Sequence, residues 1–413
     1  MKINENKKTI CMVTTTRADW GLLSPLAHKI AMDKDLKLRI VVSGTHLNKK
    51  FGKTYLEIKQ EKLPIHKKIP ILKYGDSQLD IAKTMARTLT KFSQYFLATQ
   101  PDLIIILGDR YEAMCVSLAA SNLNIPIAHL CGGESTQGAN DEYMRHCITK
   151  MSYLHFPTTQ TYLNRIVQLG ENPKRVFNVG SLAVENIYNT PLMNQSELAS
   201  FLDISTNFLQ NFCLLTYHPA TLEIHQQHNN TTTQQQIQLI IDTLLTHPFN
   251  IIATKANADC QGEIINQTLT QYARKFPKKI ILKPSLGKLG YLSALQYAKF
   301  MIGNSSSGLS EAPILKIPTI NIGDRQKGRL NIASVINTPL LQKNITQAIH
   351  QAMDTDFLQS INNLSHPFGN GNTSSQIVKI IKDFLYNQTI DIKKSFYDLY
   401  NDDSTLKNTK GLN

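Results

Sequence analysis

Short apolar segments alternate with longer helix-like segments along most of this chain. The apolar segments are continuous and do not alternate with polar residues, as in Leu103–Leu107. Continuous apolar segments are typical of strands covered on both faces, and their alternation with helices predicts parallel, doubly wound sheets. We expect strands over residues 9–14, 36–42, 103–107, 125–130, 153–157, 175–179, 212–217, 249–254, 279–283, 300–302 and 318–322.

The helix-like segments fill the intervals between these strands. We expect helices over residues 21–32, 77–99, 110–122, 159–169, 233–245, 263–275, 289–299, 308–315 and 374–386. Because a single core stops growing near roughly 250–300 residues, a chain of 413 residues should form two domains. The prediction is an α/β fold with two Rossmann-like domains around a central cleft. They cover residues 1–185 and 186–372, and a C-terminal helix and polar surface tail follow over residues 373–413.

Composition restricts the class of protein. Hydrophobic residues make up 42% and charged residues 18% of the chain, as in soluble globular proteins. No apolar run approaches a membrane span and the first residues are polar, so we expect a cytoplasmic protein without a membrane partner. The net charge of +13 comes from single or paired lysines, which favours anionic ligands but not nucleic acid. The six cysteines form no CxxC pair or zinc spacing, so we expect reduced thiols and no metal.

A Gly/Ser turn follows the strand expected at residues 300–302. The segment Gly303–Gly308 contains Ser305, Ser306 and Ser307, and a helix is expected directly after it. Backbone N–H groups and hydroxyls at such a turn bind phosphate well, and Glu311 is placed to accept hydrogen bonds from a ribose. The turn therefore predicts a nucleotide or nucleotide-sugar site; the alternative is a plain strand–helix connection.

Polar side chains follow the other strands as well. Arg17 and His46 come after the first two strands, and Asp109 and Arg110 come after the strand at 103–107. Arg17 can pair with a diphosphate, or it can be a surface arginine at the start of a helix. Asp109 can act in chemistry or serve as a helix N-cap. Ligands of parallel sheets bind at these strand ends, so their joint placement favours a site.

Two more strand ends carry titratable groups. Gly132–Glu134 follows the strand at 125–130, and Asp141 lies a few residues further on. Either carboxylate can act as acid or base if burial raises its pKa, or can simply pair with Arg145 or cap the following helix. His218 closes the strand at 212–217, where a structural role is the alternative to catalysis.

The ordered set of motifs resembles one known family, the hydrolysing UDP-N-acetylglucosamine 2-epimerases. It is most similar to the bacterial enzymes that start sialic-acid and legionaminic-acid synthesis. The similarity runs from about residue 9 to residue 384. It rests on the segments 108–112, 132–134, 141–150, 218–219, 257–259, 303–308 and 321–329.

The resemblance implies a GT-B architecture and a role for each matching residue. Arg17 is similar to the arginine that contacts the diphosphate, Ser305 and Ser306 to phosphate-binding serines, and Glu311 to a ribose-binding glutamate. Arg325 falls in the motif that closes over the nucleotide. Further residues expected to bind substrate or UDP are His46, Arg110, His146, Asn257, Ser307 and Gly308.

The catalytic residues implied by the resemblance are Asp109, Asp141 and His218. Some relatives have a glutamate where this chain has Cys131, which leaves Glu134 as the nearest carboxylate. The sequence alone does not say which carboxylate is the base and which the acid.

The implied reaction removes the C2 proton of the sugar, expels UDP, and adds water to the resulting glycal. The substrate is UDP-N-acetylglucosamine or UDP-N,N'-diacetylbacillosamine, and the product is N-acetylmannosamine or its 4-acetamido-6-deoxy analogue. We expect no cofactor and a homodimer or homotetramer. Three alternatives remain open: a GT-B glycosyltransferase, a non-hydrolysing epimerase, and an inactive nucleotide-sugar sensor.

Overall fold

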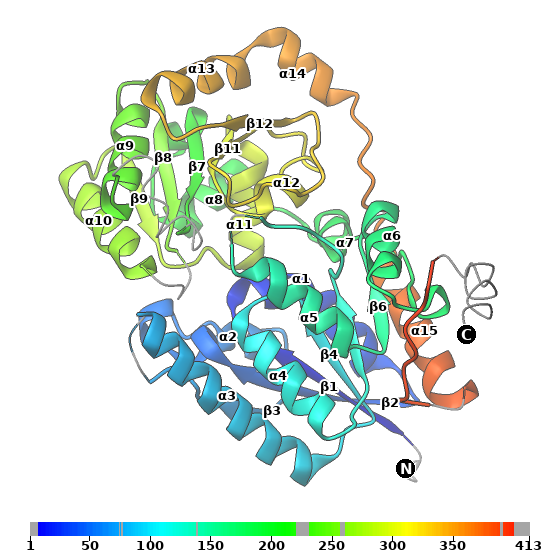
Figure 1. The fold of residues 1–413 in the computed structure, drawn as a ribbon. Helices are drawn as coiled ribbons and strands as arrows, with labels where there is room; N and C mark the ends of the chain where they lie inside the picture. Colours follow the sequence, from blue (N-terminus) through cyan, green and yellow to red (C-terminus); the bar gives the residue numbers. More distant parts are fainter. Residues whose placement is uncertain are drawn as a thin grey trace, which may run out of the picture.

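The protein folds into two parallel sheets with helices on both faces (Figure 1). The computed structural model describes residues 7–73, 75, 77–137, 139–219, 231–256, 261–388 and 391–399. Within these residues the first sheet has the strand order β3-β2-β1-β4-β5-β6 and the second has β12-β11-β10-β7-β8-β9. The strands are β1 (Lys8–Thr14), β2 (Leu36–Ser43), β3 (Ile65–Ile69), β4 (Leu103–Leu107), β5 (Ile127–Leu130), β6 (Leu154–Phe156), β7 (Phe212–Thr216), β8 (Asn250–Thr254), β9 (Ile280–Lys283), β10 (Met301–Gly303), β11 (Thr319–Ile322) and β12 (Val335–Thr338).

Helices connect most of the successive strands, so the predicted doubly wound organisation is confirmed. Both sheets have the same order, in which the fourth strand lies beside the first and the direction of winding reverses. The helices are α1 (Arg17–Met32), α2 (Tyr55–Gln60), α3 (Gln78–Thr99), α4 (Tyr111–Asn122), α5 (Asp141–Met151), α6 (Gln160–Gln168), α7 (Leu182–Asn189), α8 (Gln195–Leu202), α9 (Thr233–Leu245), α10 (Gly262–Lys275), α11 (Gly287–Tyr297), α12 (Ser307–Ser310), α13 (Gln342–Met353), α14 (Thr355–Asn362) and α15 (Thr373–Asn387).

Each sheet has a core on both of its faces. In β1, Ile10 and Met12 pack with α1 and α15, whereas Cys11 and Val13 pack with α3 and α4 on the opposite face. The second sheet repeats this arrangement, with α8 and α11 on one face and α9, α10 and α13 on the other. Burial on both faces explains why the central strands are continuously apolar.

The strand prediction needs three corrections: one predicted strand is absent, and the strands β3 and β12 were not predicted. The segment 175–179 is not a strand; it forms only an isolated bridge between Val176 and His155. The edge strand β3 was not predicted because its sequence, Ile65–Ile69, has three polar residues between two isoleucines. His66, Lys67 and Lys68 are all exposed, so the middle of this strand meets solvent on both faces, and its charged residues are typical of a sheet edge.

The chain passes twice between the two sheets, and the passages touch. The first lies near Ser181, where Val179 belongs to the N-terminal core and Ala183 to the C-terminal core. The second passage leads back to the N-terminal domain after Phe368. The carbonyl oxygen of Phe368 accepts a hydrogen bond of 2.8 Å from the Ser181 N–H. The division into domains at residues 185 and 372 stays a proposal, since α7 contacts both α1 and α15.

The C-terminal elements pack against the N-terminal domain. Helix α15 contacts α1 (Figure 1), and residues 391–399, expected to be part of a surface tail, are anchored to the same domain. Lys394 Nζ donates to the backbone oxygens of Lys150 (2.8 Å) and Ser152 (2.6 Å), at the C-terminal end of α5. It also lies 2.6 Å from a carboxylate oxygen of the buried Glu171. A cation at these carbonyl oxygens interacts favourably with the negative end of the α5 dipole. It thereby stabilises the helix that carries Asp141 and Arg145.

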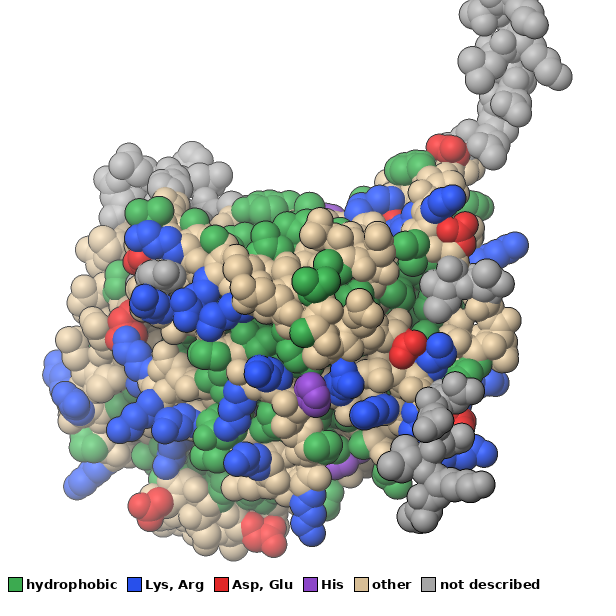
Figure 2. Space-filling view, turned by 90° about the horizontal axis from the view of Figure 1, so that it is seen from below, with side chains coloured by type: hydrophobic (Ala, Val, Ile, Leu, Met, Phe, Trp, Pro, Cys, Tyr) green, Lys and Arg blue, Asp and Glu red, His purple; other side chains and the backbone are tan. Residues whose placement is uncertain are grey.

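The visible surface is basic but has no single basic block. Figure 2 shows Lys and Arg side chains spread over one face among hydrophobic and other side chains, with few acids. In the part of the chain that the structure describes, no helix combines the length and the apolar character needed to cross a bilayer.

Replacing Lys394 with Met should lower the free energy of unfolding at pH 7 by about 1–3 kcal/mol, because the variant loses charge-assisted hydrogen bonds to buried acceptors. Burial raises the pKa of Glu171, but hydrogen bonds from His155, from Lys150 and from Lys394 outweigh burial and lower the pKa to about 2. This stabilisation is complete above the ordinary pKa of 4.5 and is lost as the pH falls toward about 2. Chemical denaturation from pH 7 to pH 3 measures the difference, with exposed Lys393→Met as the matched control. Equal stability of the two variants would contradict the anchoring role.

Candidate active site

The carboxyl ends of both sheets face one cavity of about 260 Å³. In each sheet the winding reverses between the first and fourth strands, β1 and β4 in one and β7 and β10 in the other. Parallel sheets bind ligands at this position. Residues after β1 and β4 line one side of the cavity, and residues after β7 and β10 line the other. The strand-end clusters predicted from the sequence therefore lie across a shared cleft.

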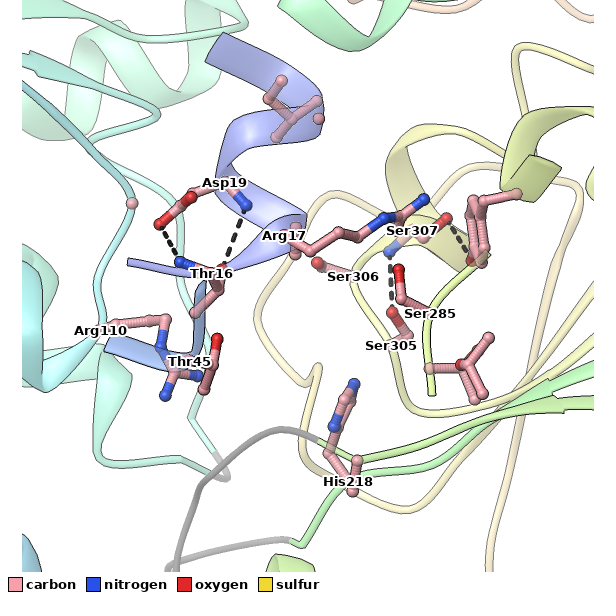
Figure 3. A pocket seen from close by; sticks show the side chains of 18 of the residues that line it. Thr16, Arg17, Asp19, Thr45, Arg110, His218, Ser285, Ser305, Ser306 and Ser307 are labelled. Atoms are coloured by element: carbon pink, nitrogen blue, oxygen red, sulfur yellow. Dashed lines mark hydrogen bonds between the residues drawn. The ribbon is translucent and has the colours of Figure 1, made fainter. Parts of the chain in front are cut away.

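The Gly/Ser turn forms part of the C-terminal wall, and Ser305, Ser306 and Ser307 all line the cavity (Figure 3). Gly303 has a φ of 132°, and a side chain there would collide with the carbonyl oxygen of Thr216. The following helix was predicted over 308–315, but α12 ends after one turn at Ser310. Pro313 explains the early end, because its ring excludes the helical conformation for the preceding residue and it has no N–H.

Arg17 reaches across the cleft from the first turn of α1. Its guanidinium donates a hydrogen bond to the carbonyl oxygen of Gly287 and lies 5.2 Å from the ring centre of Tyr291, both on α11. Among the residues that the structure describes, the Arg17 Nε has no hydrogen-bond partner. Arg17 therefore brings a positive charge to the serine turn. A phosphate bound there can accept hydrogen bonds from the guanidinium N–H groups that are still free to donate.

Glu311 lies just after α12 and also faces the cavity. Ser307 donates a hydrogen bond to its carboxylate, and Tyr291 donates to Ser307 at 2.8 Å. Burial raises the pKa of Glu311, and Ser307 and Arg17 partly oppose this. The carboxylate can accept hydrogen bonds from sugar hydroxyls, as predicted for a ribose-binding residue.

The N-terminal wall carries carboxylates held by arginines. Asp109 forms an ion pair with Arg145, whose side chain has no solvent exposure, and Asp141 lies 3.7 Å from Arg325. The alternative reading of Asp109 as an N-cap is wrong, because Arg110 occupies that position of α4. Both aspartates line the cavity, so their carboxylates face the space opposite the serine turn.

Glu134 lies in an adjoining, smaller hollow that Asp109 also lines. Its carboxylate contacts Arg329 at 2.5 Å, whereas Arg145 contacts only its backbone oxygen. Burial raises the pKa of Glu134, and the nearby Arg329 and Arg165 oppose that rise. Cys131 sits at a left-handed position with φ of 61°, and burial raises the pKa of its thiol, so it stays protonated.

His218 follows β7 and lines the cavity from the C-terminal side (Figure 3). Its backbone is fixed by Asn304: the His218 N–H donates to Asn304 Oδ1 at 2.7 Å, and Asn304 Nδ2 donates to the His218 oxygen at 2.8 Å. Arg325 Nη1 donates to the Asn304 carbonyl oxygen at 3.1 Å. His218, the serine turn and Arg325 thus share Asn304 as a common support.

The remaining predicted site residues differ in whether they line the cavity. Arg110 lines the cavity, and its Nε contacts Glu112 at 3.1 Å. His46, His146 and Gly308 do not line it within the described residues. Asn257 lies outside the described residues, so its prediction has no structural outcome.

His46 is buried behind the cavity wall and not within it. Its ring nitrogens lie 2.9 Å from Thr14 Oγ1, 2.8 Å from Thr54 Oγ1 and 3.7 Å from an Asp19 oxygen. Burial would raise the pKa of Asp19, but hydrogen bonds from His46, Thr14 and the backbone outweigh burial and lower it. Asp19 in turn completes the capping box of α1 with Thr16, so His46 supports the helix that carries Arg17.

Several residues of the site were not predicted from the sequence. Tyr291 of α11 contacts both Arg17 and Ser307, and Lys288 lines the cavity. Neither stands at a strand end, so no signal marked them. Arg329 falls within the quoted segment 321–329, and its position in that motif is the one signal that pointed to it.

Two Rossmann-like sheets with facing strand ends and one shared cavity define a GT-B-like fold with an interdomain site. A solved structure of MnaA from S. aureus with UDP has the same fold, with a TM-score of 0.75 at 17% identity, over 95% of this chain and 100% of that chain. A family model described as UDP-N-acetylglucosamine 2-epimerase matches residues 28–382. The chain belongs to the UDP-N-acetylglucosamine 2-epimerase family, as the motifs predicted.

Two curated relatives match nearly the whole chain. A protein named GDP/UDP-N,N'-diacetylbacillosamine 2-epimerase (hydrolyzing), from Campylobacter jejuni, is 43% identical over 95% of this chain and 100% of its own length. Polysialic acid biosynthesis protein P7 from Escherichia coli is 36% identical over 95% of this chain and 98% of its own length.

Ser305→Ala and Glu311→Ala should each weaken UDP binding about ten- to hundredfold, because each removes a hydrogen bond to a charged group worth roughly 1.5–3 kcal/mol. Calorimetric titration with UDP measures the affinity. Ser360→Ala on α14 is the matched control, since this serine donates only to a nearby backbone oxygen at 2.7 Å. Unchanged affinity in both site variants would contradict the phosphate and ribose roles.

Proposed function

We propose that this protein is a hydrolysing UDP-sugar 2-epimerase, which releases UDP and a free 2-epimerised 2-acetamido sugar. The observation that carries the proposal is the division of one cavity into two chemically different walls. Arg17 and Ser305–Ser307 offer donors for a diphosphate on one wall. Asp109 and Asp141 face them from the other, with Glu134 in the adjoining hollow. Family membership supports the same activity.

The proposed reaction begins with proton removal at C2. A carboxylate takes the proton, the C2–H electron pair forms the C1–C2 double bond, and the C1–O bond breaks with its electrons going to UDP. Arg17 and the serine turn stabilise the negative charge that develops on the leaving diphosphate. Water then adds a hydroxyl to C1 of the glycal and a proton to C2 on the opposite face. One UDP-sugar and one water thereby give UDP and the free epimer.

For the sugar we propose UDP-N,N'-diacetylbacillosamine, with UDP-N-acetylglucosamine as the second candidate. The support is the name of the C. jejuni relative, with which this chain shares 43% identity over the full length of that protein. The free product would be a precursor of a nonulosonic acid, either legionaminic or sialic acid. The name of the E. coli relative supports a role in this kind of biosynthesis. A cytoplasmic homodimer or homotetramer remains a prediction.

A glycosyltransferase of the same architecture is the main rival. It would use the same nucleotide wall but would leave C2 untouched, so it would not need a base near that carbon. The paired carboxylates Asp109 and Glu134, each fixed by an arginine, favour proton transfer.

Incubation with UDP-N,N'-diacetylbacillosamine in deuterium oxide should release UDP and place deuterium at C2 of the free sugar, because the original proton is lost to a base in exchange with solvent. Proton NMR follows both products, with UDP-N-acetylglucosamine and the GDP-linked sugar as parallel donors. Complete retention of the C2 proton would exclude elimination and favour a transferase or a simple hydrolase.

Glu134→Gln and Asp109→Asn should each lower turnover by about a hundredfold or more, in line with the loss of a positioned acid or base. Cys131→Ala should leave turnover nearly unchanged, because a neutral thiol at this position does not transfer protons. Asp109→Asn also leaves the buried Arg145 short of a partner, which costs roughly 3–5 kcal/mol, so turnover must be assayed well below its melting temperature. Asp324→Asn, an exposed acid, is the control.

A severe activity loss in Cys131→Ala with nearly normal Glu134→Gln would reverse this assignment. Turnover and melting temperature measured on the same samples separate loss of chemistry from loss of folding.

A further inference from the structure

The loop between β11 and β12, residues 323–334, starts from the C-terminal sheet and lies against the N-terminal domain. The Gln137 N–H donates to the Lys327 oxygen at 2.9 Å, and the Leu330 N–H donates to the Tyr162 hydroxyl at 3.0 Å. The two contacts flank Arg329 in the sequence. The loop therefore fixes the position of that residue at the N-terminal wall.

The guanidinium of Arg329 contacts two of the carboxylates in the proposed mechanism. Its Nη1 lies 2.5 Å from Glu134 Oε2, and its Nη2 lies 4.0 Å from Asp109 Oδ2. The side chains of Arg329 and Glu134 are each only 12% exposed, so solvent screens the pair weakly. Asp109 has Arg145 as a second, closer cation, whereas Glu134 depends mainly on Arg329.

The surroundings of Glu134 contain few other groups that could hold its charge. Arg165 donates to the Gly133 oxygen at 2.6 Å, and Arg145 donates to the Glu134 backbone oxygen at 3.0 Å. Within the described residues, Arg329 is thus the one cation that forms an ion pair with the carboxylate itself. The titratable and charged groups that face Glu134 from the packed elements are Arg329, Arg165, Arg145, Tyr162, Cys131 and Asp109.

We propose that Arg329 is a positioning residue that keeps Glu134 ionised and oriented as the base for the C2 proton, supplied to the N-terminal wall by the nucleotide-binding domain. The proposal rests on the proposed function. Its step is the transfer of the C2 proton to a Glu134 oxygen, with the C–H electrons forming the double bond as UDP leaves. Without Arg329, burial would favour the protonated carboxyl, which cannot accept a proton.

The same loop links the base to the nucleotide wall. Arg325 and Gln326 both donate to the Asn304 carbonyl oxygen, at 3.1 Å and 2.8 Å, and Asn304 directly precedes Ser305. One short segment thus contacts the support of the serine turn at one end and Glu134 at the other. Because Arg329 belongs to the C-terminal domain and Glu134 to the N-terminal domain, the ion pair between them forms only when the two walls are together.

The test compares Arg329→Met with Arg329→Lys, and Lys327→Met is the matched control because its side chain is 61% exposed on the same loop. UDP release is measured from pH 5 to pH 9 as kcat and as kcat/KM. We expect Arg329→Met to lower kcat at pH 7 by about tenfold or more and to move the acid limb of the profile upward by about one pH unit or more. Arg329→Lys should restore most of kcat and most of the position of the acid limb, and Lys327→Met should change neither kcat nor the acid limb.

A second measurement does not depend on activity. Carbon-13 NMR of labelled glutamate carboxyl groups, with Glu134→Gln for assignment, reports the pKa of Glu134 directly, and this pKa should rise in Arg329→Met and return in Arg329→Lys. An unchanged pKa of Glu134 in folded Arg329→Met would overturn the proposal. An effect of Arg329→Met on KM alone would also overturn the proposal. So would a shift of only the alkaline limb of the pH profile, because Glu134 would then act as an acid. Absence of UDP release from any donor by the unmodified protein would instead reject the proposed function.

Discussion

A buried guanidinium organises the acidic wall of the cleft. The side chain of Arg145 has no solvent exposure, and it donates to Asp109, to Thr136 Oγ1 at 3.0 Å and to the backbone oxygen of Glu134 at 3.0 Å. A charge removed from water is tolerated only with close partners, so these groups must keep their places for the domain to fold. The position of the Asp109 carboxylate and that of the Glu134 backbone are therefore fixed by folding and do not wait for a ligand.

The sequence predicted the architecture wherever burial on both faces left an apolar strand. β4 and α9 have the predicted bounds, and most other elements differ by one to four residues. It failed where structure depends on remote contacts: the polar edge strand β3 and the strand β12 were missed, and 175–179 was wrongly predicted to be a strand. The predicted helices also did not include α2, α5, α7, α8, α13 and α14. The helix after the serine turn was too long in the prediction, because the prediction took no account of Pro313.

For the site, the rule that ligands bind at strand ends placed Asp109, His218 and Ser305 around one cavity. The same rule placed His46 too, which instead lies one layer behind, against Asp19. Contacts that cross between the domains could not be predicted, because no local pattern encodes them. The contact of Arg17 with Gly287 joins residues 270 positions apart. The pairing of Arg329 with Glu134 is of the same kind.

The double passage of the chain between its domains has a mechanical consequence. Gly180 and Gly369, with φ of 78° and 85°, lie against each other where the passages meet, and neither has room for a side chain. Two covalent links that touch at one point form a pivot: one domain can turn relative to the other, but it cannot slide away. Turning leaves the bonds within each wall intact and breaks only those between walls, such as Arg17 to Gly287 and Arg329 to Glu134. Access of solvent to the cleft and the pairing of Glu134 with Arg329 thus both depend on the angle between the two domains.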